Sequence, residues 1–191
     1  FDAQEDMGDW TSADYDTSSW EDATEYAHAG EGVYGRLYAR GIPFLKDYGL
    51  KPYMNSKAYE NYTVKKTFGE KITLDIPYNA QLTPYLKIIA PAGKKIRITT
   101  ENTLIGAVST TYITKEGEQE FEALGWFNGE HITYKIPKDV TVVYLMYRET
   151  GYNSSFSGDY RSDDEFLDSL WQKSLRTLYV TMRDNFMDCP D

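Results

Sequence analysis

The spacing of apolar residues changes along this chain, and that change limits what the chain can fold into. Between residues 59 and 156 apolar and polar residues alternate, as in Ile72–Ile76 and Lys95–Thr99. A repeat of two residues places one face of a β-strand against a core. From residue 159 the spacing becomes three to four residues, which is typical of an amphipathic helix. We therefore expect a group of strands followed by a single long helix.

The expected strands are short and are separated by proline and glycine turns. Turn chemistry is expected at Pro77–Asn79, Pro91–Lys94 and Pro137–Asp139. Strands separated by such turns, without helical segments between them, favour two packed antiparallel sheets. The predicted fold class is mainly β, an antiparallel β-sandwich of the jelly-roll or supersandwich type. The strand segments are Ile72–Ile76, Tyr85–Ile89, Lys95–Thr99, Tyr112–Thr114, Glu118–Phe121, His131–Ile136 and Val140–Tyr147.

Charge and composition divide the chain into three predicted regions. Residues 1–45 form an acidic strap, the tail of a preceding sandwich domain; residues 46–158 form the β-sandwich; and residues 159–191 form a linker helix. The net charge is −10, and the stretch from Phe1 to Glu31 contains ten acidic residues and no lysine or arginine. Such a block repels phosphate, so no nucleic-acid partner and no anionic membrane surface is expected. Trp10 and Trp20 are expected to hold the strap by burial rather than to form a sugar platform.

The C-terminal helix has a clear start and one apolar face. Ser162 and Glu165 have the spacing of a capping box, with Ser162 as the N-cap. The stripe is expected to bury Leu170, Trp171 and Leu178 against the sandwich or against a second copy, which would make the exposed helix face a dimer contact. The stripe consists of Phe166, Leu167, Leu170, Trp171, Leu175, Leu178 and Met182.

Few residues suggest reaction chemistry. The single cysteine, Cys189, excludes an internal disulfide framework and a multi-thiolate zinc site, and His28 and His131 lie far apart, so no metal and no cofactor is expected. No stretch has the roughly 20 apolar residues of a membrane span. Arg148 and Glu149 follow a very apolar strand. They either orient a functional carboxylate or form a salt-bridged sheet margin next to a Thr150–Gly151 turn.

Four segments, taken in order, resemble one enzyme family. Phe186–Asp191, with the sequence FMDCPD, resembles the D-C-P-x-R-(D)-E-R junction of glycoside hydrolase family 78, the bacterial α-L-rhamnosidases. In that family the junction lies at the entry of a helical (α/α)₆ barrel. The other three segments are similar to the end of an N-terminal sandwich, a turn of the next β-domain and the start of the linker helix. They are Phe1–Ala3 with Trp10 and Asp16–Ala23, then Pro91–Gly93, and Ser162–Leu167.

The resemblance implies a role for one residue of this chain. Asp188 matches the D-C-P aspartate, which contacts the rhamnose ring in the family. The general acid and the base would both fall after Asp191, so no catalytic residue is expected in the chain itself. Family members hydrolyse terminal α-L-rhamnosyl linkages with inversion, using two carboxyl groups about 6.5–9.5 Å apart. The implied partners are a rhamnose-containing glycan and a helical catalytic barrel, in a bacterial periplasmic or extracellular parent protein.

Two functions of different classes remain open from the sequence. In the first, the chain is the non-catalytic sandwich and linker helix of an α-L-rhamnosidase-like hydrolase. In the second, it is an autonomous carbohydrate-binding module that grips glycans with exposed Tyr and Trp rings. An uncovered apolar stripe on the helix favours the first function, and coplanar exposed rings on one sheet face favour the second.

Overall fold

The computed structural model describes residues 1–28, 30–100 and 108–183, which belong to two compact units. One unit is Glu5–Pro43, and the other comprises Phe1–Gln4 with Phe44–Asp191. The sequence places the first four residues in the strap, but they pack on the sandwich. The Phe1 amino group donates to the Thr111 carbonyl at 2.9 Å, and the Phe1 ring stacks on Tyr112 and Phe121. Aromatic packing therefore joins these residues to the second unit.

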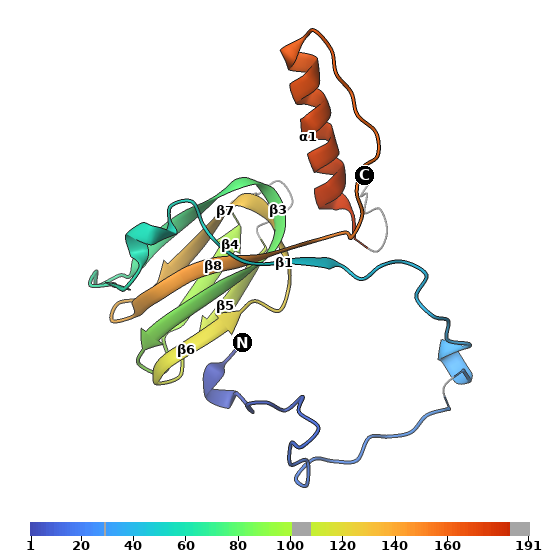
Figure 1. Cartoon of the computed structure of the whole chain (residues 1–191). Coiled ribbons are helices and arrows are strands. Elements are labelled where there is room, and N and C mark those ends of the chain that lie inside the picture. The colour runs from blue at the N-terminus through green and yellow to red at the C-terminus, as the bar shows by residue number, and fades with distance from the viewer. Residues whose placement is uncertain (29, 101–107, 184–191) are drawn as a thin grey trace. The chain divides into compact units, whose positions relative to one another are not determined.

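The second unit holds an antiparallel sheet followed by one α-helix (Figure 1). Helix α1 covers Glu165–Thr181, and the 3₁₀ turns are η1 Ala3–Glu5, η2 Gly32–Tyr34 (in the first unit) and η3 Ser56–Tyr59. The mainly β fold with a single C-terminal helix is confirmed. The strands are β1 Lys46–Pro52, β2 Tyr62–Thr63, β3 Glu70–Ala90, β4 Lys95–Thr100, β5 Ser109–Ile113, β6 Gly117–Glu122, β7 Phe127–Ile136 and β8 Thr141–Gly151.

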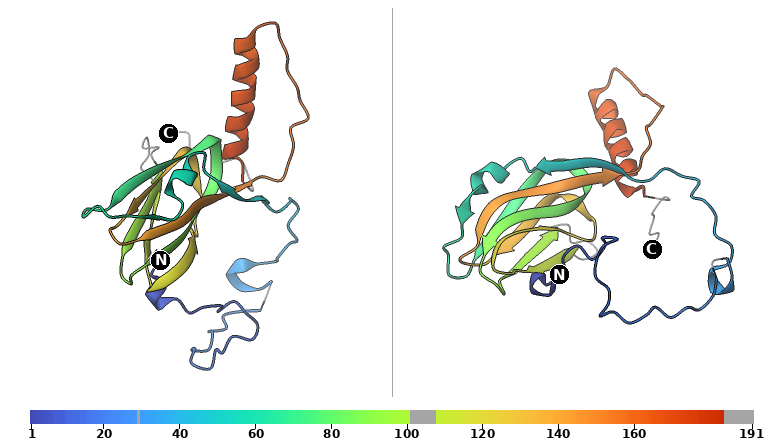
Figure 2. Two further views of the ribbon diagram at one scale, coloured as in Figure 1. Left: turned by 60° about the vertical axis from the view of Figure 1, so that its left-hand side comes forward. Right: turned by 60° about the horizontal axis from the view of Figure 1, so that its bottom comes forward.

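Both layers of the sandwich belong to one hydrogen-bonded sheet. Its order is β1-β8-β3-β7-β4-β5, with β2 added on β8 and β6 added on β3. The first half of β3 pairs with β7, and its second half pairs with β6 and β8. The long strand β3 therefore passes from one layer to the other, and the sheet curls over itself (Figure 2). Two separate sheets were expected, but the continuity of β3 makes them one.

A wide bulge in the middle of β3 replaces a turn expected at Pro77–Asn79. The register with β7 jumps from Asp75↔His131 to Ala80↔Gly129, so four residues of β3 oppose a single residue of β7. Proline donates no backbone hydrogen bond, so it is tolerated within a strand only where the ladder is interrupted. The bulge turns Tyr78 and Asn79 out of the ladder, toward helix α1.

The core combines aliphatic and aromatic side chains and includes a hydrogen-bonded pair of tyrosines. Tyr53 and Tyr134 are both buried, and their hydroxyl groups lie 2.9 Å apart. Burial raises the pKa of both hydroxyls, because it disfavours the charged phenolate. Tyr134 raises the pKa of Tyr53 further, whereas the hydrogen bond with Tyr53 partly offsets the rise in the pKa of Tyr134. The largest buried aliphatic side chains are Ile72, Leu74, Leu82, Leu86, Ile88, Ile96, Ile98 and Ile132.

This pair predicts a loss of stability in alkali. A tyrosine whose folded pKa is raised contributes stability that is complete below the unfolded pKa, 10.0, and is lost as the pH rises toward the folded value. Above about pH 10, each of the two should cost up to about 1.4 kcal/mol of unfolding free energy per pH unit. The free energy of unfolding, measured with urea, should fall less between about pH 8 and pH 11 for Tyr53→Phe than for the native chain. Tyr26, which is exposed, provides the control, and an equal effect of Tyr26→Phe would contradict this account.

Helix α1 starts at a different cap from the expected one. The Asp164 carboxylate accepts the Phe166 amide at 2.8 Å, so Asp164 is the N-cap in place of Ser162. The Ser162 amide donates to Asp168 at 2.8 Å, and the Ser162 hydroxyl accepts the Asp164 amide at 3.1 Å. Ser162 therefore shapes the turn before the helix. Among the described residues, no helix is long and apolar enough to cross a membrane.

The apolar stripe of α1 is largely uncovered, against expectation. Phe166 and Leu170 are 69% and 49% exposed, and Leu167 and Leu178 are also exposed. Trp171 is partly buried and packs against Tyr160 with ring centroids 5.7 Å apart. The prediction that Leu170 and Leu178 are buried against the sandwich is wrong, because α1 meets the sheet only near its C-terminal end (Figure 1).

The acidic unit, Glu5–Pro43, consists of turns, irregular segments and the short η2. The expected turn at Asp16–Trp20 is present: the Asp16 carboxylate accepts the Ser18 amide at 2.9 Å, and this bond lowers the pKa of Asp16. Trp20 packs on Tyr15 with ring centroids 5.7 Å apart. Trp10 and Trp20 are nevertheless 52% and 45% exposed, so the expected burial of both rings is not found.

Candidate functional site

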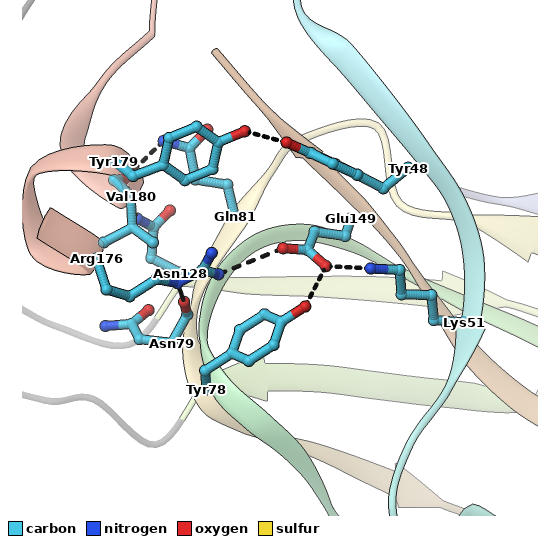
Figure 3. A network of polar contacts seen from close by, with 10 residues as sticks. All are labelled: Tyr48, Lys51, Tyr78, Asn79, Gln81, Asn128, Glu149, Arg176, Tyr179 and Val180. Atoms are coloured by element: carbon cyan, nitrogen blue, oxygen red, sulfur yellow. Dashed lines mark hydrogen bonds and ion pairs between the residues drawn. The ribbon is translucent and has the colours of Figure 1, made fainter. Parts of the chain in front are cut away.

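A network of polar side chains lies where the C-terminal end of α1 meets the sheet (Figure 3). Strands β1, β3, β7 and β8 all contribute to it, and we call it the helix-anchoring cluster. Its contacts join residues far apart in sequence. The members are Tyr48, Lys51, Tyr78, Asn79, Gln81, Asn128, Glu149, Arg176, Tyr179 and Val180.

Glu149 is the centre of the cluster and is 3% exposed. Its Oε2 accepts hydrogen bonds from Lys51 Nζ at 2.6 Å and from the Tyr78 hydroxyl at 3.0 Å. Partial burial alone lowers the pKa of Lys51, but the hydrogen bond and the charge of Glu149 outweigh it and raise that pKa. A buried carboxylate is stable only with such partners, so Glu149 holds β1, β3 and β8 together.

Arg176 connects α1 to this carboxylate. Its Nη2 lies 3.3 Å from Glu149 Oε1, and its Nε donates to the Asn79 carbonyl in the β3 bulge at 2.7 Å. The guanidinium lies 4.1 Å from the centre of the Tyr78 ring. One arginine therefore combines an ion pair, a hydrogen bond and a cation–π contact.

Side chains of the sheet also satisfy the carbonyl groups at the end of α1. Gln81 Nε2 donates to the Val180 carbonyl at 2.5 Å and to the Met182 carbonyl at 2.8 Å. Asn128 Nδ2 donates to the same Val180 carbonyl at 3.2 Å. The last carbonyls of a helix have no partner within the helix, so these amides act as a cap supplied by β3 and β7.

A tyrosine contact closes the cluster on the β1 side. The hydroxyl groups of Tyr48 and Tyr179 lie 2.6 Å apart, and the Tyr179 ring meets Phe156 edge-on. Burial and the bond to Tyr48 raise the pKa of Tyr179. The ring of Tyr179 lies directly over Gly151, where a methyl group would be 2.3 Å from its hydroxyl oxygen. Gly151 therefore leaves the space that Tyr179 occupies.

This geometry favours mechanical anchoring over catalysis. Both oxygens of Glu149 are engaged by three donors, and the residue is nearly inaccessible to solvent, so it has no free position from which to transfer a proton. Among the described residues, no group of three or more His, Cys, Asp or Glu side chains could hold a metal ion. The cluster can fix the direction in which α1 leaves the sandwich.

The structure separates the two residues that the sequence placed together. Glu149 points to the helix, whereas Arg148 pairs with Glu122 at 2.8 Å and Asp47 at 2.9 Å on the other side of β8. Neighbouring residues of a strand face opposite sides, so Arg148 does not orient Glu149. Thr150–Gly151 belongs to β8 and forms no turn.

The remaining expected residues lie elsewhere. Asp188, the expected substrate-binding residue, and Cys189 lie outside the described residues. His28 Nδ1 lies 3.6 Å from Glu25 Oε1 in the acidic unit. His131 is on β7, and its Nδ1 lies 2.9 Å from Oδ1 of Asp75 on β3.

The sequence alone does not reveal the partners of Glu149. Lys51 and Tyr78 are separated from it by 98 and 71 positions. Two signals were available: a glutamate at the end of the most apolar strand, and an arginine on the helix. The third residue, Tyr78, could not be recognised, because the neighbouring Pro77 predicts a turn at this place.

Comparison with known proteins identifies related folds. No protein-family model and no curated protein matches the sequence. A GH78 family rhamnosidase of Bacillus sp. GL1 superposes with a TM-score of 0.56 at 22% identity, over 66% of this chain and 15% of that chain. A rhamnosidase from Klebsiella oxytoca, solved with rhamnose bound, gives 0.58 at 11% identity, over 77% of this chain and 37% of that chain.

At sequence identities of 22% and 11%, these similarities show a shared fold and nothing further. The chain spans 15% and 37% of the two rhamnosidase chains that it matches. Most of this chain therefore shares its fold with parts of two larger rhamnosidase chains. The resemblance expected from the sequence motifs is confirmed at the level of the fold.

Proposed function

We propose that this chain is the non-catalytic sandwich and linker helix of an α-L-rhamnosidase-like glycoside hydrolase, in which it positions a helical catalytic domain. The parent protein would hydrolyse terminal α-L-rhamnosyl linkages with inversion. Asp188 would contact the rhamnose ring, and the acid and base would come from the catalytic domain. The fold shared with parts of two rhamnosidases supports this proposal.

The observation that carries the proposal is the contrast between the two ends of α1. Its C-terminal end is fixed by the helix-anchoring cluster, whereas Phe166, Leu167 and Leu170 remain exposed toward its N-terminal end. Each large apolar side chain left in water forgoes about 1.5–3 kcal/mol of burial. A rigidly held helix with an open apolar stripe is suited to packing against another domain.

The alternative, an autonomous carbohydrate-binding module, has weaker support. It requires exposed coplanar rings on one sheet face. Tyr85 and Tyr144 are stacked with an interplanar angle of 9°, but Tyr85 is buried and bonds Glu120, so the pair offers no open platform.

Substitutions in the stripe should separate these functions. In the isolated chain, Leu170→Ser and Leu178→Ser should change the unfolding free energy by less than about 0.5 kcal/mol each, because both residues are exposed. In the longer hydrolase that the proposal requires, the pair should cost about 2 kcal/mol or more and reduce kcat/KM for an aryl α-L-rhamnoside. Urea unfolding and release of the aryl group measure the two effects.

The matched control is Lys173→Ser, since Lys173 is an exposed polar residue of the same helix. It should be silent in both proteins. The isolated chain should release no aryl group, and light scattering would show whether the stripe pairs two copies instead. Hydrolysis by the isolated chain, or stripe variants that leave the hydrolase unchanged, would refute the proposal. Tight binding of rhamnosyl glycans by the isolated chain would favour the module.

A further inference from the structure

A row of positive charges crosses the outer face of the layer opposite the helix-anchoring strands β1 and β8. Lys135 of β7 lies directly opposite Lys71 of β3 on one side and Arg97 of β4 on the other. All three residues are exposed, and their strand neighbours Ile72, Ile96 and Ile136 are buried. Adjacent strands lie about 4.8 Å apart, so the row spans about 10 Å. Like charges directly opposite one another destabilise a sheet.

Several other cations of the sandwich have acidic partners. Lys87 pairs with Glu118 and Glu120 at 2.9 and 3.0 Å, and Arg148 pairs with Glu122 and Asp47. Within the part of the chain that the structure describes, Lys95, Arg97 and Lys135 have no acidic side chain within ion-pair distance. From Gly32 onward the chain has 20 acids and 20 bases, so the unpaired state of these three neighbouring cations is a feature of arrangement and not of composition.

The row borders an open hollow of about 430 Å³, lined by Phe68, Lys71, Lys95, Lys135 and Pro137 among others. Its one acid, Glu70, is held by Lys66 at 2.6 Å and by the Tyr62 hydroxyl at 2.5 Å. These hydrogen bonds lower the pKa of Glu70. The carboxylate therefore remains ionised but is directed to Lys66 and Tyr62.

An aromatic ring stands at the rim of this hollow. Phe68 is fully exposed, at 102%. The next residue, Gly69, has a φ of +76°, and a Cβ there would lie 2.6 Å from the Ile136 carbonyl oxygen. Only glycine allows this close approach, which fixes the turn beside the end of β7. The backbone thus places Phe68 next to the cations.

We propose that this hollow binds an acidic oligosaccharide that carries carboxylate groups. Lys95, Arg97 and Lys135, with Lys71, would pair with carboxylates on neighbouring sugar units, and Phe68 would pack against the apolar face of a sugar ring. A nucleic acid fits less well, because it carries one phosphate per about 1.7 Å and is therefore repelled more strongly by the net charge of −10 than a chain with one carboxylate per sugar unit. The inference concerns a different surface from α1 and does not depend on the proposed hydrolase role.

Calorimetric titration of the whole chain with oligogalacturonate tests the proposal. The fully methyl-esterified oligomer is the matched ligand control, since it has the same sugar units without charge. The acid form should bind at least tenfold more tightly, and binding should weaken as salt rises from about 50 to 300 mM. Equal binding of the two forms, no binding at about 10 mM ligand, or tighter binding of oligothymidylate would overturn the proposal.

Charge reversal at Lys135 supplies the variant test. Lys135→Glu should weaken oligogalacturonate binding at least tenfold, while the melting temperature stays equal or rises because the new carboxylate lies between Lys71 and Arg97. Phe68→Ala should weaken binding several-fold. Lys57→Glu changes the net charge equally at an exposed site of η3 and should alter binding less than twofold. A loss at Lys57→Glu equal to that at Lys135→Glu would show that only net charge matters and would refute the site.

Discussion

Glu149→Ala should lower the free energy of unfolding by about 2–4 kcal/mol. The substitution leaves Lys51, Tyr78 and Arg176 without their common acceptor, at a place where solvent reaches them only in part. The range lies somewhat below that of a fully buried pair, because both cations keep some contact with water. In a chain of this size the loss corresponds to a fall in Tm of roughly 5–15 °C. Urea unfolding and thermal melting measure it directly.

The neighbouring residue provides the control for Glu149→Ala. Arg148→Ala removes two ion pairs on the other side of β8, where the partners are more exposed, and should cost no more than about 1 kcal/mol. Hydrogen exchange should show a second difference: Glu149→Ala should release the amides of residues 176–181, whereas Arg148→Ala should leave them protected. If the two variants cost the same, Glu149 does not anchor the helix.

The contribution of Lys51 to this anchor depends on pH in a defined direction. Its folded pKa is raised above the ordinary 10.5, so the pair with Glu149 contributes fully below that value and is lost as pH rises through the folded pKa. Near neutral pH the anchor is therefore complete. The direction in which α1 leaves the sandwich should then be insensitive to pH across the physiological range.

Alternation of apolar residues predicted most of the sheet because the buried side chains of β4, β6, β7 and β8 face one core. The edge strand β1 escaped prediction, since the sequence KDYGLKP has no alternation and the strand pairs on one side only. The continuity of β3 was also missed. Whether a proline ends a strand or occupies a bulge depends on the partner strand, and the Asp75/Ala80 register with β7 is a tertiary property.

The helix illustrates the same limit for the candidate site. The spacing of three to four residues predicted α1 and its stripe, but not which part of the helix touches the sheet. Sequence periodicity favoured burial of Leu170 and Leu178, whereas contact is made by Arg176, Tyr179 and Val180 near the C-terminal end. Polar contacts, which periodicity does not detect, decide the position of this helix.

Gly151→Ala should detach the end of α1 by overpacking and cost about 1–3 kcal/mol. The new Cβ would lie 2.3 Å from the Tyr179 hydroxyl oxygen and 2.7 Å from Cζ. The ring has little freedom to move away, because Tyr48 holds its hydroxyl at 2.6 Å and Phe156 meets the ring in a T-shaped contact. Gly158→Ala is the control, since a Cβ there meets no atom within 4 Å.

A double-mutant cycle tests whether Tyr179 is the cause of that loss. In a Tyr179→Ala background, Gly151→Ala should cost less than about 0.5 kcal/mol, because the clashing ring is gone, and the coupling energy should fall within about 0.5–3 kcal/mol. Tyr179→Phe should not relieve the clash, since Cζ and Cε1 would remain 2.7 and 2.9 Å from the new methyl group. Hydrogen exchange at residues 176–181 distinguishes local detachment from global unfolding. Equal costs of Gly151→Ala in both backgrounds would place the strain in β8 itself and would remove Tyr179 from the anchor.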